Sequence, residues 1–339
     1  MSQVTLRRAL LVGAALAFAS GCSGGGLSST QNPSSLTPSS RAIPPGMRML
    51  PGPVVSGPRL VAIVPLKPNA PLGWPAHHRR HKEILFVADG NSGVLLYNPR
   101  VPNSAPTGSI TTGVNAPSQV AVDSAKALYV VNSGNNTVTV YPKGATSPSL
   151  TITGGLSSPY GVTVDSKGNV FVSNLGNNTV TAYQAGQTTP YATMNFSSLG
   201  QPVGVGSDAL DNIWVACDSS NKVFEIPAGT TTPKDAGLSG LNGPIGVAFG
   251  KSDIMYVSNF AASNVNVYAY GTTTPSATIT AGIEHFGPTL GGFTATGAYF
   301  QSNQGDNVVG YKSGATSPFS TLTGATSPLG VASEPLVTK

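Results

Sequence analysis

The fold is decided by residues 159–183, which read PYGVTVDSKGNVFVSNLGNNTVTAY. β-Branched and aromatic residues, which favour strands, alternate here with short runs of Gly, Asn, Asp and Ser, which favour turns. The stretch therefore predicts three consecutive strands, at residues 160–165, 170–174 and 179–183. A fourth strand is expected after Pro190, because proline is tolerated beside an outer strand but not within a central ladder.

The same pattern returns at regular intervals along the chain. Its second strand begins six times, 42 to 44 residues apart, at Leu85, Leu128, Val170, Ile213, Met255 and Tyr299. Repeats of this length with only strand-like content are typical of β-propellers, in which each repeat forms one four-stranded blade. All third strands but one, which ends in Ile226, end in a tyrosine that we expect to pack between blades. These tyrosines are Tyr97, Tyr141, Tyr183, Tyr268 and Tyr311.

The two ends of the repeat predict how the ring closes. Residues 84–89 form a second strand that no innermost strand precedes, and residues 329–333 form an innermost strand that no second strand follows. Pairing the two completes six blades and removes the open sheet edges that favour aggregation. We therefore predict an all-β, six-bladed propeller over residues 83–339, closed by the C-terminal strand.

The repeat also resembles a known family. Its alternation of a Pro-x-Gly-Val-x-Val-Asp strand with a Gly-Asn-Val-Phe-Val-Ser-Asn strand is similar to the NHL-repeat family of six-bladed propellers, from residue 83 to the C-terminus. The chain is more distantly similar to the gluconolactonase–regucalcin and streptogramin lyase propellers. Because such propellers serve both as binding platforms and as enzymes, the resemblance implies the fold and leaves the function open.

Residues 1–21 have the features of a bacterial export signal: two arginines, a short apolar run and small residues. Cys22 follows a segment that resembles a lipoprotein cleavage box, which makes it the expected lipid acceptor. Ordinary cleavage after residues 17–19, Ala-Phe-Ala, is the alternative. We expect an exported cell-envelope lipoprotein that is attached to the membrane through lipidated Cys22. By resemblance to bacterial lipoproteins, Ser23 implies the outer membrane or the cell surface.

The segment between this signal and the propeller is basic and rich in turn formers. Residues 22–56 are mostly Ser, Gly and Pro and are expected to form a disordered tether. Residues 57–82 form a basic extension with a candidate short strand at residues 60–64. Its densest run, residues 77–82, reads His-His-Arg-Arg-His-Lys and is either a solvated linker or a contact for an anionic envelope surface.

Charge argues against a nucleic-acid partner. Residues 1–82 hold nine Lys or Arg and no Asp or Glu, whereas residues 83–339 hold nine Lys or Arg against thirteen Asp or Glu, a formal charge of −4. The basic isoelectric point therefore belongs to the export signal and tether and not to the folded domain, so no nucleic-acid binding is expected.

Candidate ligand-binding residues lie where the second strands end. The geometry implied by the family brings these residues together at one mouth of the central channel, and Tyr160 lies near them. They are Asp89, Asn132, Asn174, Cys217, Asn259 and Asn303. A ring rich in Asn suits a polar ligand, a glycan, or a Ca²⁺ or other divalent cation. The alternative is that each residue caps its own turn.

Cys217 and three aspartates outside this ring have different expected roles. Cys217 replaces the usual Asn or Asp and is expected to be a small buried residue without a disulfide partner. Asp123 and Asp165, together with Asp208, follow the innermost strands, and the family geometry places them at the opposite mouth as turn formers.

One repeat departs from the pattern near residue 284. Glu284 and His285 form the one adjacent carboxylate–imidazole pair expected at the mouth, which makes them the candidates for ligand contact or general-base catalysis. A drifted surface loop is the alternative. The lyase resemblance requires paired His and Glu around Mg²⁺, and the propeller has one histidine, so no metal site is assigned.

The first hypothesis for the function is a non-enzymatic propeller that binds a polar ligand, a glycan or an envelope protein. The alternatives are a metal-dependent hydrolase or lyase, and a structural spacer.

Overall fold

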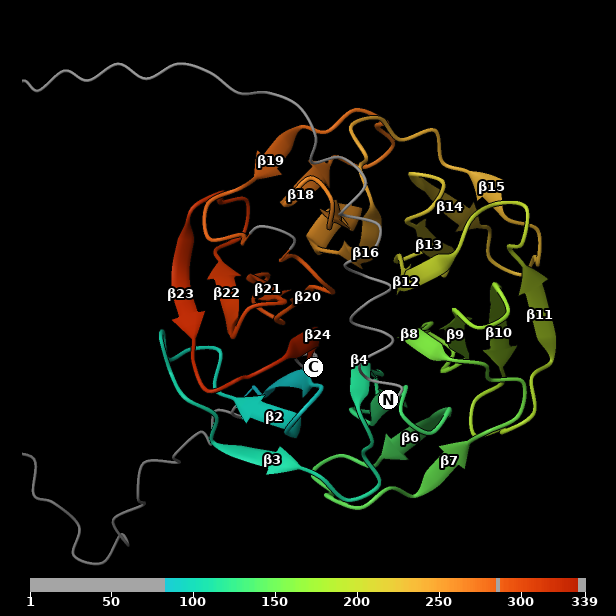
Figure 1. Cartoon of the computed structure of the whole chain (residues 1–339), viewed down its shortest axis with the longest axis horizontal. Coiled ribbons are helices and arrows are strands. Elements are labelled where there is room, and N and C mark those ends of the chain that lie inside the picture. Colours follow the sequence, from blue (N-terminus) through green and yellow to red (C-terminus); the bar gives the residue numbers. More distant parts are fainter. Residues whose placement is uncertain (1–82, 285–286, 335–339) are drawn as a thin grey trace, which may run out of the picture. The chain divides into compact units, whose positions relative to one another are not determined.

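The computed structural model describes residues 83–284 and 287–334. These residues form six four-stranded antiparallel sheets arranged as a ring (Figure 1), which confirms the predicted six-bladed propeller. The export signal, Cys22, the tether and the basic run at residues 77–82 lie outside the described residues, as do His285 and residues 335–339. Predictions about those segments therefore stay predictions.

The strands of each blade are given from the innermost strand outward. Blade 1 contains β24 (Pro328–Ser333), β1 (Leu85–Asp89), β2 (Gly93–Tyr97) and β3 (Gly108–Ile110). Blade 2 contains β4 (Pro117–Val122), β5 (Leu128–Asn132), β6 (Thr137–Tyr141) and β7 (Leu150–Ile152). Blade 3 contains β8 (Pro159–Val164), β9 (Val170–Asn174), β10 (Thr179–Tyr183) and β11 (Ala192–Asn195).

The second half of the ring has the same strand order. Blade 4 contains β12 (Pro202–Ser207), β13 (Ile213–Cys217), β14 (Lys222–Ile226) and β15 (Lys234–Asp235). Blade 5 contains β16 (Pro244–Phe249), β17 (Met255–Asn259), β18 (Asn264–Tyr268) and β19 (Ala277–Ile279), with the 3₁₀ turn η2 (Lys251–Asp253) after β16. Blade 6 contains β20 (Gly292–Phe293), β21 (Tyr299–Asn303), β22 (Asn307–Tyr311) and β23 (Pro318–Leu322).

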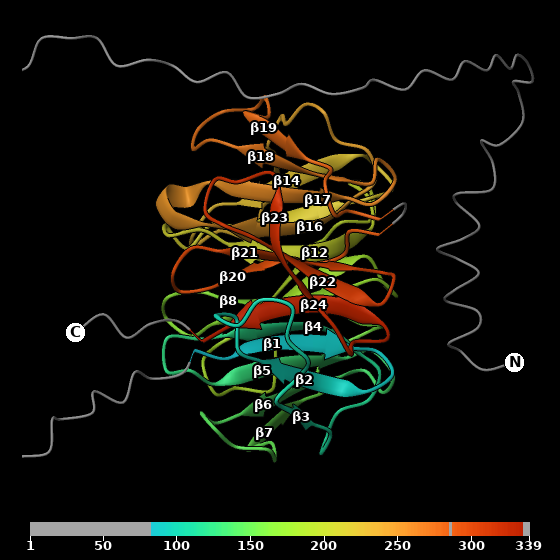
Figure 2. The same cartoon turned by 90° about the vertical axis from the view of Figure 1, so that its left-hand side faces the viewer.

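Blade 1 is shared between the two ends of the domain, as predicted. Strand β24 pairs with β1 in antiparallel register, and Figure 2 shows the two strands side by side. The carboxylate of Asp89, at the end of β1, accepts hydrogen bonds from the backbone N–H groups of Thr326 and Ser327 at 2.6 and 2.9 Å. This closure joins residues more than 230 positions apart and pairs the edge of β1 that would otherwise be open.

Glycine in the innermost strands lets neighbouring blades approach closely at the centre. A Cβ atom on Gly161 would lie 2.6 Å from the carbonyl oxygen of Val203, and one on Gly204 would lie 2.4 Å from that of Ile245. Both distances are shorter than any real Cβ contact allows. The Gly of the Pro-x-Gly-Val motif is therefore required by the spacing of the ring rather than by a turn.

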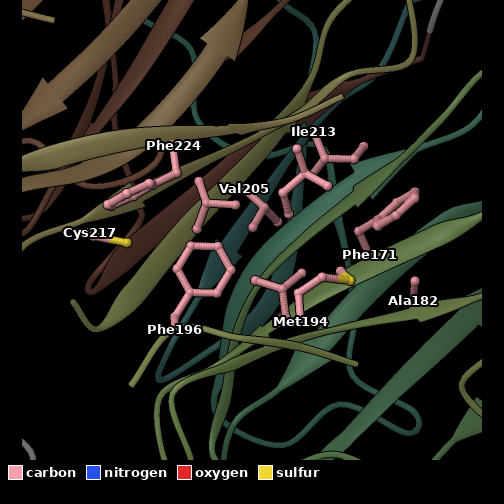
Figure 3. Packing of buried hydrophobic residues seen from close by; sticks show 11 residues of the cluster. Phe171, Ala182, Met194, Phe196, Val205, Ile213, Cys217 and Phe224 are labelled. Atoms are coloured by element: carbon pink, nitrogen blue, oxygen red, sulfur yellow. The ribbon is translucent and has the colours of Figure 1, made fainter. Parts of the chain in front are cut away.

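Apolar side chains fill the spaces between blades. The tyrosines that end the third strands are at most 1% exposed, which confirms that they pack between blades. Their hydroxyl groups have a second role that the sequence did not reveal: Tyr183 donates to the carbonyl of Gly154 at 2.7 Å, and Tyr141 donates to that of Thr112 at 2.7 Å. Figure 3 shows the cluster between blades 3 and 4, where Phe196 packs edge to face against Phe224.

The two faces of the propeller carry different connections. We call the upper face the one that carries the turns after the second strands and the segments that link one blade to the next. The lower face carries the turns that follow the innermost strands and the loops that join third to outer strands. In blade 3, residues 175–178 form the upper turn, and residues 165–169 and 184–191 form the lower turn and loop.

Candidate functional site

The residues of the predicted upper-face ring are fully buried. Asp89, Asn132, Asn174, Cys217, Asn259 and Asn303 each have 0% exposed surface. Asp89, Asn132, Asn174 and Asn259 already form hydrogen bonds inside the protein, because they hold the segment that enters each blade. Cys217 forms no such bond, and Oδ1 of Asn303 has no partner among the described residues. Ligand binding by these residues stays a prediction, but burial leaves them no surface with which to meet a ligand.

Asn174 illustrates the bonding that this position makes. Its Oδ1 accepts the backbone N–H of Ser157 at 3.0 Å, and its Nδ2 donates to Oγ1 of Thr181 at 3.1 Å. Asn132 and Asn259 repeat the first bond with the residue seventeen positions earlier. The side chain therefore ties the upper turn and the third strand of its blade to the incoming segment, which goes beyond capping its own turn.

Blade 4 replaces this asparagine by Cys217. The thiol is buried, has no disulfide partner among the described residues, and packs in the core cluster of Figure 3, as expected. Burial, together with the nearby charge of Asp218, raises the pKa of the thiol to about 12. Burial also raises the pKa of the Asp218 carboxyl. The thiol is thus neutral at physiological pH and unsuited to act as a nucleophile.

Glu284 lies on the upper face at blade 6. Its carboxylate accepts a hydrogen bond from Nδ2 of Asn307, whose Oδ1 in turn accepts one from Nδ2 of Asn303 at 2.8 Å. The structure therefore links two of the predicted site residues, Glu284 and Asn303, through a third that the sequence did not single out. His285 lies outside the described residues, so its pairing with Glu284 remains a prediction.

Two blades lack the innermost glycine, and the side chains at this position contact the innermost strands of neighbouring blades. Leu290 is 1% exposed, and its Cδ2 occupies the space that a Cβ on Gly204 or Gly246 would need. Gln119 is also buried and accepts the backbone N–H of Val162 at 2.9 Å. Tyr160 lies at the start of β8 on the upper face and is partly buried.

The carboxylates predicted for the lower face are turn formers, as expected from their positions in the repeat. Asp165 accepts the backbone N–H groups of Lys167 and Asn169 at 2.9 and 2.8 Å. Asp123 accepts the backbone N–H of Ala127 at 2.8 Å. Asp208 forms the equivalent turn in blade 4, but it also lies beside a cavity that the sequence analysis did not find.

A cavity of about 260 Å³ lies between blades 4 and 5 towards the lower face. Aromatic and acidic side chains form much of its wall, and the loop at residues 269–273 borders it. These side chains are Asp208, Trp214, Glu225, Phe249, Asp253 and Tyr270. The indole N–H of Trp214 donates to Oδ2 of Asp208 at 2.9 Å, which fixes the ring, and Trp214 contacts Phe249 with their centroids 5.7 Å apart. Tyr270 is 65% exposed at the edge of the cavity.

Two departures from the repeat explain why the cavity lies at this interface. Glu225 occupies a third-strand position that is apolar or Gly in the other blades, where it is Leu96, Val140, Ala182, Val267 or Gly310. Ala236 bonds through its backbone N–H to the carbonyl of Val223, at a position that carries a large apolar side chain in the other blades. Those side chains are Ile110, Ile152, Met194, Ile279 and Leu322, all at most 3% exposed.

The equivalent interface between blades 1 and 2 provides an internal comparison. Its cavity is about 50 Å³ and is lined mainly by apolar side chains, with Phe86 at the position of Trp214 and Leu96 at that of Glu225. The aromatic residue at this position is at most 8% exposed in five blades, and Trp214 alone is partly exposed. Aligning the six repeats and asking which blade gains a charge and loses a large side chain would have found this site.

Two general properties hold for the described part of the chain. No group of three or more His, Cys, Asp or Glu side chains is placed to hold a metal ion. None of its helices is both long enough and apolar enough to span a membrane.

The arrangement of blades makes the chain a six-bladed β-propeller. Comparison of structures agrees. A chain in the crystal structure of a nidogen/laminin complex matches with a TM-score of 0.63 and 13% identity, over 75% of this chain and 100% of that chain. A Bacteroides caccae protein of unknown function matches with a TM-score of 0.58 and 12% identity, over 74% and 98%.

A streptogramin B lyase structure matches with a TM-score of 0.54 and 12% identity, over 74% of this chain and 87% of that chain. The expected likeness to streptogramin lyases is thus confirmed for the fold alone, because identities this low carry no site residues across. No protein-family model and no curated protein matches the sequence, so the NHL-repeat resemblance stays a prediction.

Proposed function

We propose that this protein is a non-enzymatic, envelope-tethered propeller that binds a small polar ligand, such as a sugar, in the cavity between blades 4 and 5. The observation that carries the proposal is the contrast between this cavity of about 260 Å³ and the cavity of about 50 Å³ at the equivalent interface of blades 1 and 2. A volume of this order is smaller than a typical drug-sized site and suits a monosaccharide or a similar group.

The lining of the cavity matches the chemistry of a sugar. Trp214, Phe249 and Tyr270 supply apolar ring surface on which the C–H face of a sugar can pack. The Glu225 carboxylate, which makes no hydrogen bond or ion pair with any described residue, can accept hydrogen bonds from ligand hydroxyl groups. The upper-face asparagine ring offers no comparable opening, since its side chains are buried.

Tryptophan fluorescence of the full-length protein tests this proposal. Replacing Trp74 by Phe leaves Trp214 as the one tryptophan, so its emission reports on the cavity. We expect saturable changes with a monosaccharide panel that includes glucose and glucosamine. Ala236→Ile should abolish them, because it restores the branched side chain that fills this position in other blades. Thr193→Ile, on the exposed outer strand of blade 3, is the matched control and should bind normally.

Equal binding by the Ala236→Ile variant and the control would refute the cavity as the site. A folded Ala236→Ile protein is expected, since an isoleucine is accommodated at this register in three other blades. Its circular dichroism and unfolding midpoint should therefore be measured beside the titration.

We also propose that Cys22 is lipidated and holds the propeller at the cell envelope. The support is the sequence of residues 1–22, in which an export signal ends in small residues directly before a cysteine. The experiment is fractionation of cells that express the Cys22→Ser variant, which should release the protein from membranes. Unchanged membrane association would contradict lipidation. The basic run at residues 77–82 is proposed to strengthen contact with anionic surfaces.

A metal-dependent hydrolase or lyase is the second candidate. The observation that favours it is the chain of hydrogen bonds from Glu284 through Asn307 to Asn303 on the upper face. Sugar-lactone hydrolysis in the presence of Mg²⁺ or Ca²⁺ tests it, with His285→Ala as the paired variant. Turnover that the variant loses would support an enzyme, whereas the binding proposal expects none.

A further inference from the structure

The cavity between blades 4 and 5 is acidic. Of the described residues that line it, Asp208, Glu225 and Asp253 carry carboxylates and none is basic. Like charges gathered in a partly enclosed space raise the local concentration of cations, because the low-dielectric walls focus their field. A neutral ligand gains nothing from this field, so the charge points to a cationic group on the ligand.

The three carboxylates are not equally available. Asp208 accepts hydrogen bonds from two backbone N–H groups of its turn, from Nδ2 of Asn212 and from the indole of Trp214. Oδ1 of Asp253 accepts the backbone N–H of Ala209 at 3.0 Å. Glu225 makes no hydrogen bond or ion pair with any described residue, so it is the group that can bond directly to a ligand cation.

One basic residue shares the blade surface of Glu225. Lys234 is its cross-strand partner on β15, and directly opposed residues of an antiparallel pair lie on the same face. Lys234 is exposed, and its ammonium group forms no ion pair with Glu225. It therefore leaves the Glu225 carboxylate free to bond to a ligand amine, and an exposed pair of this kind would contribute little in any case.

Aromatic rings complete a cation site. Trp214, Phe249 and Tyr270 line the same cavity as Glu225. The face of an aromatic ring attracts an ammonium group, and the attraction strengthens when the cation is partly removed from water. Carboxylate and rings together thus favour a protonated amine over a metal ion, which would require more oxygen ligands than the one free carboxylate supplies.

We propose that the ligand of this cavity is an amino sugar, bound through an ammonium group at Glu225 and through its ring against the aromatic wall. This inference rests on the proposed function and specifies the class of ligand. Glu225 determines the preference for an amine over a neutral sugar, and this charged side chain is particular to blade 4, since the other blades have apolar residues or Gly at its position. The aromatic rings contribute to the binding of any sugar.

The test compares glucosamine with glucose, which differ in the amine, by fluorescence titration of the full-length Trp74→Phe protein. The measurement is made at about pH 6, below the ordinary pKa of an amino group next to a polar carbon. We expect glucosamine to bind at least tenfold more tightly, because a charge-assisted hydrogen bond in a partly buried site has about this effect on affinity. The difference should shrink as salt concentration rises.

Two variants of similar size separate the roles of charge and shape. Glu225→Gln should bring the dissociation constant of glucosamine to that of glucose, with glucose itself little changed. Lys234→Gln removes the nearby exposed cation and should leave the preference for glucosamine intact. Equal affinities of the two sugars, or a preference that survives Glu225→Gln, would overturn the amino-sugar inference.

The proposed function fails by a different result. If neither sugar perturbs Trp214, or if Ala236→Ile binds as the parent does, the cavity is not the binding site and the inference falls with it. If Ala236→Ile abolishes binding of both sugars while both bind the parent equally, the cavity is the site and the preference for an amine is wrong.

Discussion

Replacing Asn174 by alanine separates a structural role of the upper-face asparagines from a ligand-binding role. Asn174 is 0% exposed and makes two well-formed hydrogen bonds, with the Ser157 N–H at 3.0 Å and with Oγ1 of Thr181 at 3.1 Å, besides longer ones. A net contribution of about 1 kcal/mol for each bond, together with the cost of the polar groups left behind, gives a loss of roughly 2–4 kcal/mol. In a domain of this size that corresponds to a fall in melting temperature of roughly 5–15 °C.

The assay is urea and thermal unfolding of full-length protein, followed by circular dichroism. Cys217→Ala is the matched control, because blade 4 has a buried cysteine at the same position that makes no such bonds. It removes one sulfur atom and should cost about 1 kcal/mol. If Asn174→Ala costs less than Cys217→Ala, or leaves stability unchanged while abolishing ligand binding, the assignment of a structural role is wrong.

Three further perturbations test the ring. Tyr183→Phe removes the phenol that donates to the Gly154 carbonyl at 2.7 Å, so urea unfolding should show a loss of about 1–1.5 kcal/mol; no loss would contradict a role for the hydroxyl. Gly161→Ala places a Cβ 2.6 Å from the Val203 carbonyl oxygen, and the expected cost of about 3 kcal/mol should appear as a lower unfolding midpoint; an unchanged midpoint would refute the spacing argument. Burial alone would raise the pKa of Asp89, but hydrogen bonds from backbone N–H groups outweigh it and hold that pKa below the ordinary value of an aspartate. The stability due to this carboxylate is therefore present above about pH 4 and lost as pH falls further, and Asp89→Asn should flatten the fall in unfolding free energy below about pH 4; an unaltered slope would exclude Asp89 as its source.

The sequence was sufficient to predict the ring because the fold depends on features that recur. The period set the number of blades, and the unmatched strands at residues 84–89 and 329–333 predicted the closure that β1 and β24 make. The terminal tyrosines were correctly predicted as packing residues. Each interface of a propeller repeats the contacts of the one before it. A wrong strand assignment in one repeat can therefore be corrected by comparison with the other five.

The location of a site could not be predicted by the same route. Recurrence of Asn at the strand ends predicts that the position matters, but it does not distinguish a buried hydrogen-bonding role from an exposed ligand-binding one. That distinction depends on how closely neighbouring blades approach each other. The approach depends on contacts between residues of different repeats, such as those of Gly204 with Ile245 and Leu290. The informative residues were the exceptions, and Glu225 and Ala236 stand out only once the blades are aligned by register.

Several departures from the repeat sequence occur together in blade 4, and the closed ring explains why the fold tolerates them. Besides Glu225 and Ala236, the blade has Ile226 in place of the tyrosine that holds the incoming segment, and Cys217 in place of the asparagine. Blade 4 therefore lacks both the tyrosine hydroxyl and the asparagine side chain that form hydrogen bonds with the incoming segment in other blades. In blade 4 the buried ring of Phe196, which lies in that segment, packs into the core instead. A closed ring allows this, since the other interfaces and the pairing of β24 with β1 maintain the fold while one interface changes. If blade 4 is the blade adapted for binding, reverting Ala236 and Glu225 together to isoleucine and leucine should raise the unfolding free energy and abolish ligand binding in the same protein. A double variant that loses stability would show that these residues serve the fold and not a site.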